Sequence, residues 1–381
     1  MTAATVTVIV PTFNRAKYIN ECIDSLLAQT VPAMEVIVVD DGSDDDTAGR
    51  LAPYGQRIHY IHKTNGGKPS AVNLGLQQAQ GEWVWIFDDD DVALPDAIEQ
   101  RLAVLAKQPD ADFVYSSHCL GRDGPDQRIE QGSRYTPPQY PHERFFLEIM
   151  RGCFFHLNSA LVRRSLYERL GGLDPALLSS EDYDFQIRLA RVAQAAFCAA
   201  PSFVFRQHGG ARGARQIRYT AAQRNRVFRR YSQTVGLKIR AEVGLGEFLC
   251  PPVRRALSLQ EQRMALRNRL HVMGNHGCVD EFVVDLAEWL QSMAATGGWS
   301  KDDGAEVARA FQRGWVYAAC SQDWPGFLCS LAPLKRLPGG RACLRALARS
   351  VLGLTAMPSR GTSQRLASAW HGARLGMIAL A

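Results

Sequence analysis

The sequence contains no cysteine pair of the form CxxC, although it has 9 cysteines among its 381 residues. An odd number of scattered cysteines does not fit a zinc ribbon or a disulfide framework. Long hydrophobic runs are also missing: no stretch of about 18 apolar residues occurs, which excludes a membrane-spanning helix. The first ten residues carry no basic leader, so no signal peptide is predicted. These absences predict a reduced, cytoplasmic protein.

Carboxylates are missing from the last part of the chain. None follows Asp323, whereas eight Lys and Arg residues do. Residues 1–220 contain 22 Lys and Arg against 27 Asp and Glu, and residues 221–381 contain 22 against 11. An acidic front half and a basic rear half predict two regions with different partners. The acidic half suits metal ions, and the basic half suits phosphates, including those of lipid headgroups.

The front half alternates between short apolar runs and segments with helical spacing. Strands are predicted at 5–10, 35–39, 58–62, 83–87 and 113–116, and helices at 16–29, 70–80 and 95–107. This alternation predicts an α/β fold with a mostly parallel central sheet and helices on both faces. Ligands of such sheets bind beyond the carboxyl ends of the strands. Polar clusters at 11–15, 40–46 and 88–91 lie at those ends.

Beyond about residue 220 the strand signal disappears. Helical spacing continues at 219–231, 252–273, 279–293 and 305–320. We therefore predict two domains: a catalytic domain over residues 1–220 and a basic α-helical domain of unknown role over residues 221–381.

Four adjacent aspartates, Asp88 to Asp91, directly follow the apolar run Trp83–Phe87. Carboxylates this crowded repel one another and raise one another's pKa unless a cation neutralises them. Oxygen ligands without a neighbouring Cys or His pair favour Mg²⁺ or Mn²⁺. The alternative is a solvated acidic turn, which the direct connection to a strongly apolar strand disfavours.

Three further polar segments are ambiguous on their own. Asp40-Asp41-Gly42-Ser43 fits either a binding loop or an ordinary strand-to-helix turn. Glu181 to Asp184 opens a predicted helix, where carboxylates either cap the helix or supply a general base. His208 follows a predicted strand and is either structural or a ligand. Taken singly, these patterns leave both readings open.

Together the segments resemble the family 2 glycosyltransferases, which have the A-type nucleotide-diphospho-sugar transferase fold, a Rossmann-like α/β architecture. The resemblance covers roughly residues 5–215, and motifs that occur in order are far more specific than any one of them. The motifs are VIVPTFNR (8–15), VIVVDDGSDDDT (36–47), NGGKPSAVNLGLQQAQGEWVWIFDDDD (65–91), GGLDPALLSSEDYDFQIRLAR (171–191) and FRQH (205–208). The helical rear is not covered.

The resemblance implies a binding site for the donor at two of these motifs. Pro11, Thr12 and Asn14 are expected to line the nucleotide pocket. Asp41 is expected to bond the uracil imide, with Asp40 shaping the turn. UDP is favoured over other nucleotides through the resemblance alone.

The resemblance also implies a metal and diphosphate site. Lys68 corresponds to a basic residue that contacts the base or the diphosphate. The DxD element of the family matches Asp88, Asp89 and Asp90, with Asp90 as a metal ligand and Asp88 or Asp89 reaching the ribose or the metal. His208 corresponds to a further metal or phosphate contact. The fourth aspartate of the run leaves the register of the ligands ambiguous by one residue.

The activity implied is a metal-dependent, inverting glycosyl transfer from a nucleotide-diphosphate sugar to an acceptor hydroxyl, with Mn²⁺ or Mg²⁺ as cofactor. Asp182 corresponds to the catalytic base in the ED motif of the family. One base and one displacement imply inversion at the anomeric carbon. The acceptor is expected to be a carbohydrate or a lipid-linked molecule in the synthesis of cell-envelope polysaccharide or glycolipid. No nucleic-acid partner is predicted.

A segment near the end of the chain has the pattern of a basic amphipathic helix. The apolar residues are Leu344, Leu347, Val351 and Leu354, and the basic residues are Arg341, Arg345 and Arg349. Such a helix lies on an anionic membrane surface, which would place the protein on the inner face of the plasma membrane. Alternatively it packs on its own protein and leaves a solvated arginine face. The sequence leaves both alternatives open.

Two other functions compete with glycosyl transfer. Asp88-x-Asp90-x-Val92 after an apolar strand fits the DxDx[TV] signature of haloacid-dehalogenase-like phosphatases, but in those proteins the signature follows the first strand. A non-catalytic nucleotide-sugar-binding protein is the second rival, which the aspartate run and Asp182 argue against. A dinucleotide-binding oxidoreductase is disfavoured because no GxGxxG follows a predicted strand.

Overall fold

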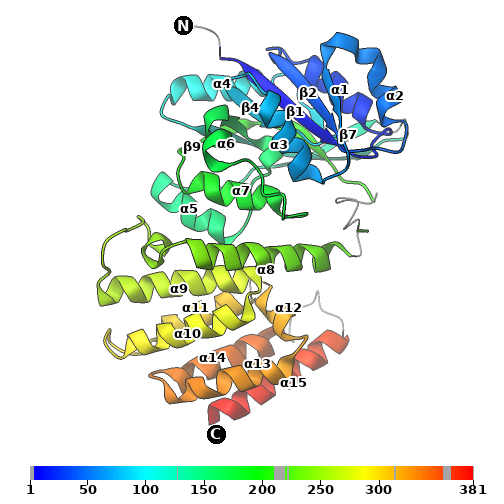
Figure 1. Cartoon of the computed structure of the whole chain (residues 1–381). Coiled ribbons are helices and arrows are strands. Elements are labelled where there is room, and N and C mark those ends of the chain that lie inside the picture. The colour runs from blue at the N-terminus through cyan, green and yellow to red at the C-terminus, as the bar shows by residue number, and fades with distance from the viewer. Residues whose placement is uncertain are drawn as a thin grey trace. The chain divides into compact units, whose positions relative to one another are not determined.

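The computed structural model describes residues 4–126, 128–209, 219–220, 223–312, 315–354 and 362–380. The chain divides into two units, whose elements are labelled in Figure 1. The α/β unit comprises Met1–Ile149 with Cys153–Phe228, and the helical unit comprises Met150–Gly152 with Arg229–Ala381. That the two units have separate functions stays a prediction.

Four parallel strands form one half of the central sheet. β1 (Val6–Thr12), β2 (Glu35–Asp40) and β3 (His59–His62) lie in the order β3-β2-β1, and β4 (Trp83–Ile86) lies on the other side of β1. β1 and β4 are buried along their whole length, as expected where helices cover both faces of a parallel sheet. The register aligns the last residues of β1 and β2, so their carboxyl ends reach the same edge of the sheet.

The other half of the sheet mixes strand directions. β8 (Leu161–Arg163) runs antiparallel between β4 and β6 (Phe113–Asp123), and β9 (Ala195–Arg206) lies parallel to β6. The short β5 (Val92–Ala93) pairs with β9, and β7 (Ile129–Tyr135) pairs with β6, both antiparallel. The predicted α/β fold class is confirmed; the sheet is parallel over β1–β4 and mixed beyond them.

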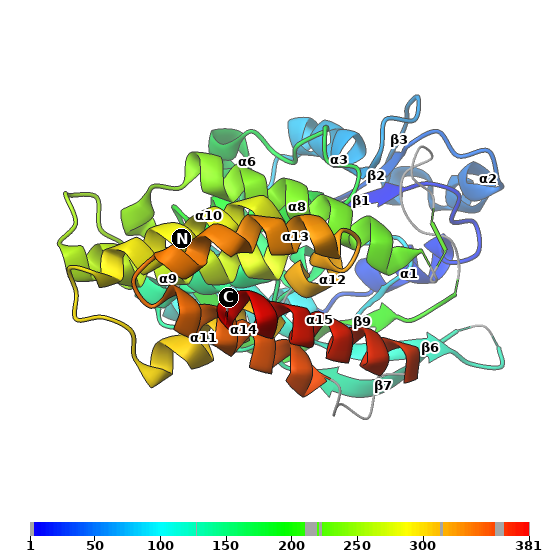
Figure 2. The ribbon, with the colours of Figure 1, turned by 90° about the horizontal axis from the view of Figure 1, so that it is seen from below.

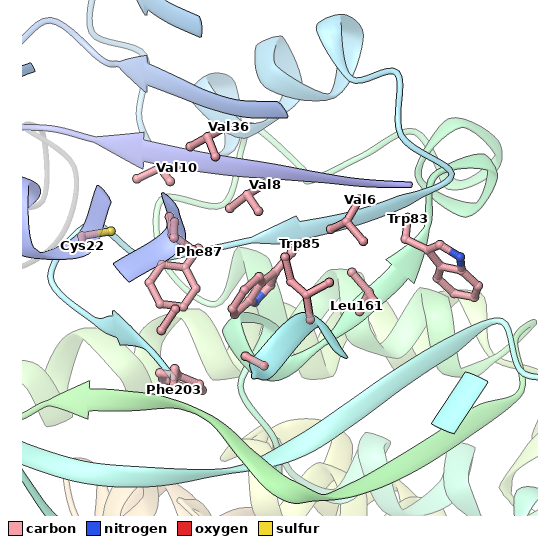
Figure 3. Close-up of a cluster of buried hydrophobic side chains, with 14 of the residues drawn as sticks. Val6, Val8, Val10, Cys22, Val36, Trp83, Trp85, Phe87, Leu161 and Phe203 are labelled. Atoms are coloured by element: carbon pink, nitrogen blue, oxygen red, sulfur yellow. The ribbon is translucent and has the colours of Figure 1, made fainter. Parts of the chain in front are cut away.

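Helices cover both faces of this sheet. They are α1 (Ile19–Leu27), α2 (Thr47–Leu51), α3 (Lys68–Gln78), α4 (Ala97–Lys107), α5 (His142–Arg151), α6 (Arg164–Leu170) and α7 (Glu181–Ala190). On one face, Trp85 and Phe87 join Ile23 of α1 in the main hydrophobic core, part of which Figure 3 shows. On the other face α3 packs closely on β1, because a Cβ on Gly75 would lie 2.5 Å from Ile9 Cγ2.

In the helical unit, the regular elements of the described residues are all helices. They are α8 (Arg224–Glu242), α9 (Leu259–His276), α10 (Val279–Met293), α11 (Lys301–Gln312), α12 (Val316–Cys320), α13 (Trp324–Leu331), α14 (Gly340–Gly353) and α15 (Thr362–Leu380). The bounds of α10 agree with the sequence prediction. The single helix expected over 305–320 is instead two helices. Phe311 and Val316 would point to different sides of one continuous helix, yet both are fully buried.

The apolar face of α14 packs inside the helical unit. Its predicted stripe is buried at all four positions, Leu344, Leu347, Val351 and Leu354. The helix lies beside α15, as Figure 2 shows, and also contacts α11. The arginines of its other face, Arg341, Arg345 and Arg349, are exposed. The structure therefore corresponds to the alternative in which α14 packs on its own protein, and this stripe is not available to a membrane.

Two expectations about the whole chain can be compared with the described residues. All nine cysteines lie among them and are free, as expected. Six of the nine are buried, where a free cysteine packs like a small apolar side chain. No helix among the described residues combines the length and the apolar run needed to cross a bilayer.

Candidate active site

The loops that follow β1, β2 and β4 enclose a cleft at the carboxyl edge of the parallel strands. Its cavity volume is about 210 Å³. Of the residues predicted for the site, those that line the cleft are Pro11, Thr12, Asp41, Lys68, Asp88, Asp89 and Asp90. The other four, Asn14, Asp40, Asp182 and His208, do not line it. The structure thus brings together side chains from three separate motifs.

The turn after β2 is held by its two aspartates. Asp40 is fully buried, and its carboxylate accepts hydrogen bonds from the backbone N–H of Ser43 at 2.9 Å and from the Tyr60 hydroxyl at 2.8 Å. Gly42 adopts a φ of 79°, and a Cβ there would lie 2.9 Å from the Asn65 nitrogen, so the turn requires glycine. Asp40 therefore shapes the turn, and the cleft is left to Asp41.

Asp41 is held by donors from the loop that follows β3. Its carboxylate accepts the backbone N–H groups of Gly66 at 2.9 Å and Gly67 at 2.7 Å. It also forms an ion pair with Lys63, whose Nζ lies 2.6 Å from Asp41 Oδ1. A carboxylate fixed by three donors is an oriented acceptor at the wall of the cleft.

Asn14 supports the cleft from outside. It is one of two non-glycine residues with positive φ among those described, at 54°. Its backbone N–H donates to Ser43 Oγ at 2.9 Å, and its side-chain Nδ2 donates to Asp44 Oδ1 at 2.6 Å. In this structure Asn14 thus connects the β1 and β2 loops, and its contact with the nucleotide stays a prediction.

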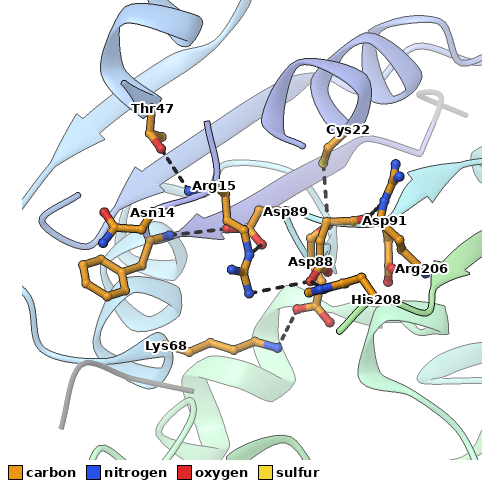
Figure 4. Close-up of polar contacts among 12 residues, drawn as sticks. Asn14, Arg15, Cys22, Thr47, Lys68, Asp88, Asp89, Asp91, Arg206 and His208 are labelled. Carbon is orange, nitrogen blue, oxygen red and sulfur yellow. Dashed lines mark hydrogen bonds and ion pairs between the residues drawn. The ribbon is translucent and has the colours of Figure 1, made fainter. Parts of the chain in front are cut away.

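Three of the four aspartates, Asp88, Asp89 and Asp90, face basic or imidazole partners at the cleft. Figure 4 labels Asp88 and Asp89 with Lys68, Arg15 and His208. Lys68 Nζ lies 2.6 Å from Asp88 Oδ1, and Arg15 Nε lies 3.3 Å from Asp89 Oδ1. His208 Nε2 lies 2.9 Å from Asp90 Oδ2. Burial, together with the smaller effect of the neighbouring Asp90, raises the pKa of Asp89 to about 7 in spite of the adjacent Arg15. The protein alone thus neutralises much of this cluster.

Asp91, the fourth aspartate, has a different role. It is fully buried, and its carboxylate accepts the side-chain amide of Asn158 at 2.5 Å and the backbone N–H of Arg206 at 2.8 Å. The Arg206 guanidinium, also fully buried, donates to the carbonyl of Asp90 at 2.7 Å. Because β9 ends at Arg206, these bonds hold the start of the 206–208 segment against the aspartate loop. Asp91 therefore faces the interior, and the cleft is lined by Asp88 to Asp90.

The N-terminus of α7 contributes a carboxylate to the cleft, and it is Glu181. Burial, together with the smaller effect of the neighbouring Asp182, raises the pKa of Glu181 to about 7. Ser180, just before the helix, has a φ of 62°, an uncommon conformation that occurs mainly where the surrounding structure imposes it. Asp182 Oδ1 accepts the backbone N–H of Tyr183 at 2.8 Å. The predicted base thus lies next to the carboxylate that lines the cleft.

The residues present can be tested for their fit to a divalent ion. Among the described residues, no three His, Cys, Asp or Glu side chains are arranged to enclose a metal. Asp90 and His208 supply one oxygen and one nitrogen donor 2.9 Å apart. Mg²⁺-type ions are usually held by one or two protein carboxylates together with substrate phosphates. The donor set therefore fits an ion shared with a diphosphate and does not fit a closed protein site.

Sequence reasoning gave little weight to several residues of the cleft. Arg15 is not among the predicted site residues, yet it pairs with Asp89 and lies 3.7 Å from Asp90. Phe13, Phe205 and Tyr219 add aromatic surface to the cleft. Phe13 and Arg15 lie inside the VIVPTFNR motif, which is a usable signal; Tyr219 lies beyond the motifs, where the sequence offers none.

Comparison with known proteins assigns the α/β unit to a family. Residues 7–171 match the family model described as glycosyl transferase family 2. This part of the chain belongs to that family. The predicted recognition is thereby confirmed, and the α/β unit carries a family 2 glycosyltransferase domain.

Curated relatives agree over about half of the chain. An uncharacterized glycosyltransferase of Rickettsia prowazekii is 34% identical over 203 residues, which cover 50% of this chain and 60% of that protein. The uncharacterized glycosyltransferase EpsJ of Bacillus subtilis is 33% identical over 203 residues, covering 50% and 57%. The chondroitin synthase of Pasteurella multocida is 30% identical over 193 residues, covering 50% and 19%. The chain thus spans less than two thirds of the length of each of these relatives.

Among solved structures, S. aureus TarS in complex with UDP-GlcNAc has the same fold. Its TM-score is 0.52 at 18% identity, and the alignment covers 92% of each chain. At this identity the likeness concerns the fold alone. It confirms the A-type glycosyltransferase architecture that the sequence motifs imply.

Proposed function

We propose that the chain is an inverting, metal-dependent glycosyltransferase that moves a sugar from a UDP-sugar to an acceptor hydroxyl. The observation that carries this proposal is the cleft at the carboxyl edge of the sheet, where Asp41, Lys68 and the aspartates after β4 converge. These residues come from three motifs of one family, and the family match includes all three.

The donor would enter the cleft with its nucleotide toward the β1 and β2 loops. Pro11 and Thr12 would contact the nucleotide, and Asp41 would accept a hydrogen bond from the uracil imide. Asp41 supports this role because its carboxylate is already oriented by Gly66 and Gly67. Preference for UDP rests on the family resemblance, and the TarS neighbour was solved with UDP-GlcNAc.

The diphosphate would lie over the aspartates, with Lys68 and Arg15 close by. Asp90 and His208 would hold Mn²⁺ or Mg²⁺, with Asp88 reaching the ion or the ribose. Bound there, the cation would neutralise the charge that develops on the leaving diphosphate. Arg15 and Lys68 now pair with Asp89 and Asp88, so ion binding would release both cations toward the phosphate oxygens.

Asp182 would act as the general base. The acceptor oxygen forms a bond to the anomeric carbon while the bond from that carbon to the diphosphate breaks, and Asp182 takes the hydroxyl proton. The leaving group is UDP, and attack from the opposite face inverts the configuration. Glu181, the neighbouring carboxylate at the start of α7, lines the cleft and would orient the acceptor.

The acceptor is proposed to be a carbohydrate or lipid-linked hydroxyl in the synthesis of cell-envelope polysaccharide or glycolipid. Likeness to a relative named chondroitin synthase supports a carbohydrate acceptor. The family match argues against the phosphatase alternative, because the aspartates after β4 lie in the third motif of a glycosyltransferase and not after a first strand.

Release of UDP from a panel of UDP-sugars, with a mixture of oligosaccharide and polyprenyl-phosphate acceptors, tests the proposal. Turnover is expected with one UDP-sugar in the presence of Mn²⁺ or Mg²⁺, and NMR of the product should show inversion at the anomeric carbon. Hydrolysis of a generic phosphate ester without any transfer from a nucleotide sugar would instead favour the phosphatase.

A further inference from the structure

The last helix, α15, exposes an apolar stripe to solvent. Trp370 is 51% exposed, Met377 59% and Leu380 75%. These positions are seven and three residues apart, so they lie on one side of the helix. The opposite side is buried in the helical unit, with Leu375 at 0% and Ala379 at 1% exposure. An aromatic and two large aliphatic side chains are thus left uncovered on a helix that is otherwise well packed.

Several arginines lie on the two helices that carry and flank this stripe. Arg374 is on α15 itself, with its guanidinium 4.7 Å from the centre of the Trp370 ring. The exposed face of the neighbouring α14 presents Arg341, Arg345 and Arg349. Leu352 continues that face and packs against α15, because a Cβ on Gly372 would lie 2.5 Å from Leu352 Cγ. No Asp or Glu occurs in the sequence after Asp323, so α14 and α15 carry no acidic side chain of their own.

We propose that the α15 stripe, formed by Trp370, Met377 and Leu380, is a docking surface for an anionic lipid membrane. The arginines around the stripe favour an anionic membrane, because their positive charge complements the negative charge of the lipid headgroups. A second copy of the chain would place the same arginines opposite one another in a symmetric interface, which like-charge repulsion disfavours. Helices that lie in the membrane interface combine Trp and aliphatic residues on one face with flanking Lys or Arg. The contact would be peripheral, since no described helix is suited to cross the bilayer.

This proposal differs from the one that the sequence suggested for the same region. The sequence placed the membrane-facing residues on α14, whose apolar side is buried in the structure. The structure gives α14 the basic part of the surface and gives α15 the apolar part. A shallow apolar insertion and several surface arginines are individually weak, but together they provide the two signals that stable peripheral binding requires.

Vesicle sedimentation of the full chain, without any sugar nucleotide, tests the proposal independently of the transferase activity. The vesicles contain equal parts of phosphatidylglycerol and phosphatidylcholine, and phosphatidylcholine alone serves as the neutral reference. Binding is expected only to the anionic vesicles and should weaken as salt is raised. W370Q together with M377Q should weaken binding at least about tenfold, because each change removes the insertion of a large apolar side chain.

M264Q is the matched control, since Met264 on α9 is 47% exposed and lies away from the stripe. It should bind vesicles like the unchanged chain, and melting temperatures should show that all variants remain folded. Equal binding of the double variant and the control, or equal binding to both kinds of vesicle, would overturn the proposal. So would a dimer that the double variant dissociates, since the stripe would then be covered by a second copy.

Discussion

The two units place charged side chains in opposite kinds of environment. In the α/β unit, carboxylates gather at the ends of strands and face a cleft, where Asp41, Asp88 and Asp89 pair with Lys63, Lys68 and Arg15, respectively. In the helical unit, the most buried carboxylate is enclosed by helices. Asp285 of α10 is fully buried and lies 2.9 Å from Arg240 of α8 and 2.8 Å from Arg269 of α9.

The accessible ion pairs of the α/β unit belong to a candidate binding site, whereas the enclosed ion pairs of the helical unit hold its helices together. An ion pair at the wall of a cleft can exchange its protein partner for a ligand, whereas a pair enclosed among helices has no such access. Breaking a buried pair is costly because it leaves an uncompensated charge in the interior. Changes at the cleft should therefore reduce activity with little loss of stability, and changes at Asp285 should do the reverse.

The largest effect is expected for Asp182→Asn in the α/β unit. An amide cannot accept the acceptor proton, so kcat should fall by about 10²- to 10⁴-fold while the affinity for the donor stays nearly unchanged. Steady-state kinetics and donor titration measure the two quantities. Glu181→Gln is the paired variant, for which a smaller loss of kcat is expected. Near-normal turnover by Asp182→Asn, with a large loss for Glu181→Gln, would move the base to Glu181.

Asp285→Ala should give the next largest effect, this time on stability. Removing the carboxylate leaves Arg240 and Arg269 unpaired inside the helical unit, at a cost of about 3 to 5 kcal/mol. Urea unfolding followed by circular dichroism measures it. Asp280→Ala, an exposed carboxylate on the same helix, should cost no more than about 1 kcal/mol. Equal midpoints for the two variants would show that the buried cluster does not hold the helices together.

Acid should destabilise the α/β unit through His118. Burial lowers its pKa to about 4, with a smaller effect of the nearby His156, and the side chain is only 3% exposed. The unfolded chain binds this proton below about pH 6.5 but the folded chain does not until about pH 4, so stability falls across that window, by up to about 3 kcal/mol. His118→Phe should flatten this part of the stability profile. If the free energy of unfolding of His118→Phe kept the same pH dependence, the loss of stability in acid would not come from His118.

The smallest effect is expected at the start of α9 in the helical unit. The Ser258 hydroxyl accepts the backbone N–H of Glu261 at 3.3 Å, and the Glu261 carboxylate accepts the backbone N–H of Ser258 at 2.8 Å. Ser258→Ala removes half of this capping box and should cost about 1 kcal/mol, with no change in donor binding. A measurable loss of donor affinity would show that the helical unit contributes to donor binding and is not only a scaffold.

Much of the α/β fold follows from local sequence. The apolar runs of β1, β2 and β4 and the helical spacing of α1, α3 and α4 gave these elements within a few residues. β8 was not predicted, since it has only three residues and pairs antiparallel with strands that are distant in the chain. The strand predicted before His208 is β9. In the helical unit, α10 was predicted with the correct bounds because its apolar residues recur clearly at helical spacing.

The site could be predicted in kind but not in detail. Motifs at strand ends identified the cleft and most of its lining. The different role of Asp91 could not be predicted, because it depends on a bond to Arg206, which is 115 residues away. Likewise, the orientation of Glu181 into the cleft depends on the positive φ of Ser180, which residue type does not reveal.

Calorimetric titration of UDP, with Mn²⁺ or with a chelator, shows whether the aspartate cleft binds a diphosphate through a divalent ion. UDP should bind the unchanged chain at least about tenfold more tightly with Mn²⁺, and Asp90→Ala should remove that gain. Asp110→Ala, an exposed carboxylate of the same unit, should retain it. Equal affinity with and without the metal, in the unchanged chain and in Asp90→Ala alike, would contradict the account.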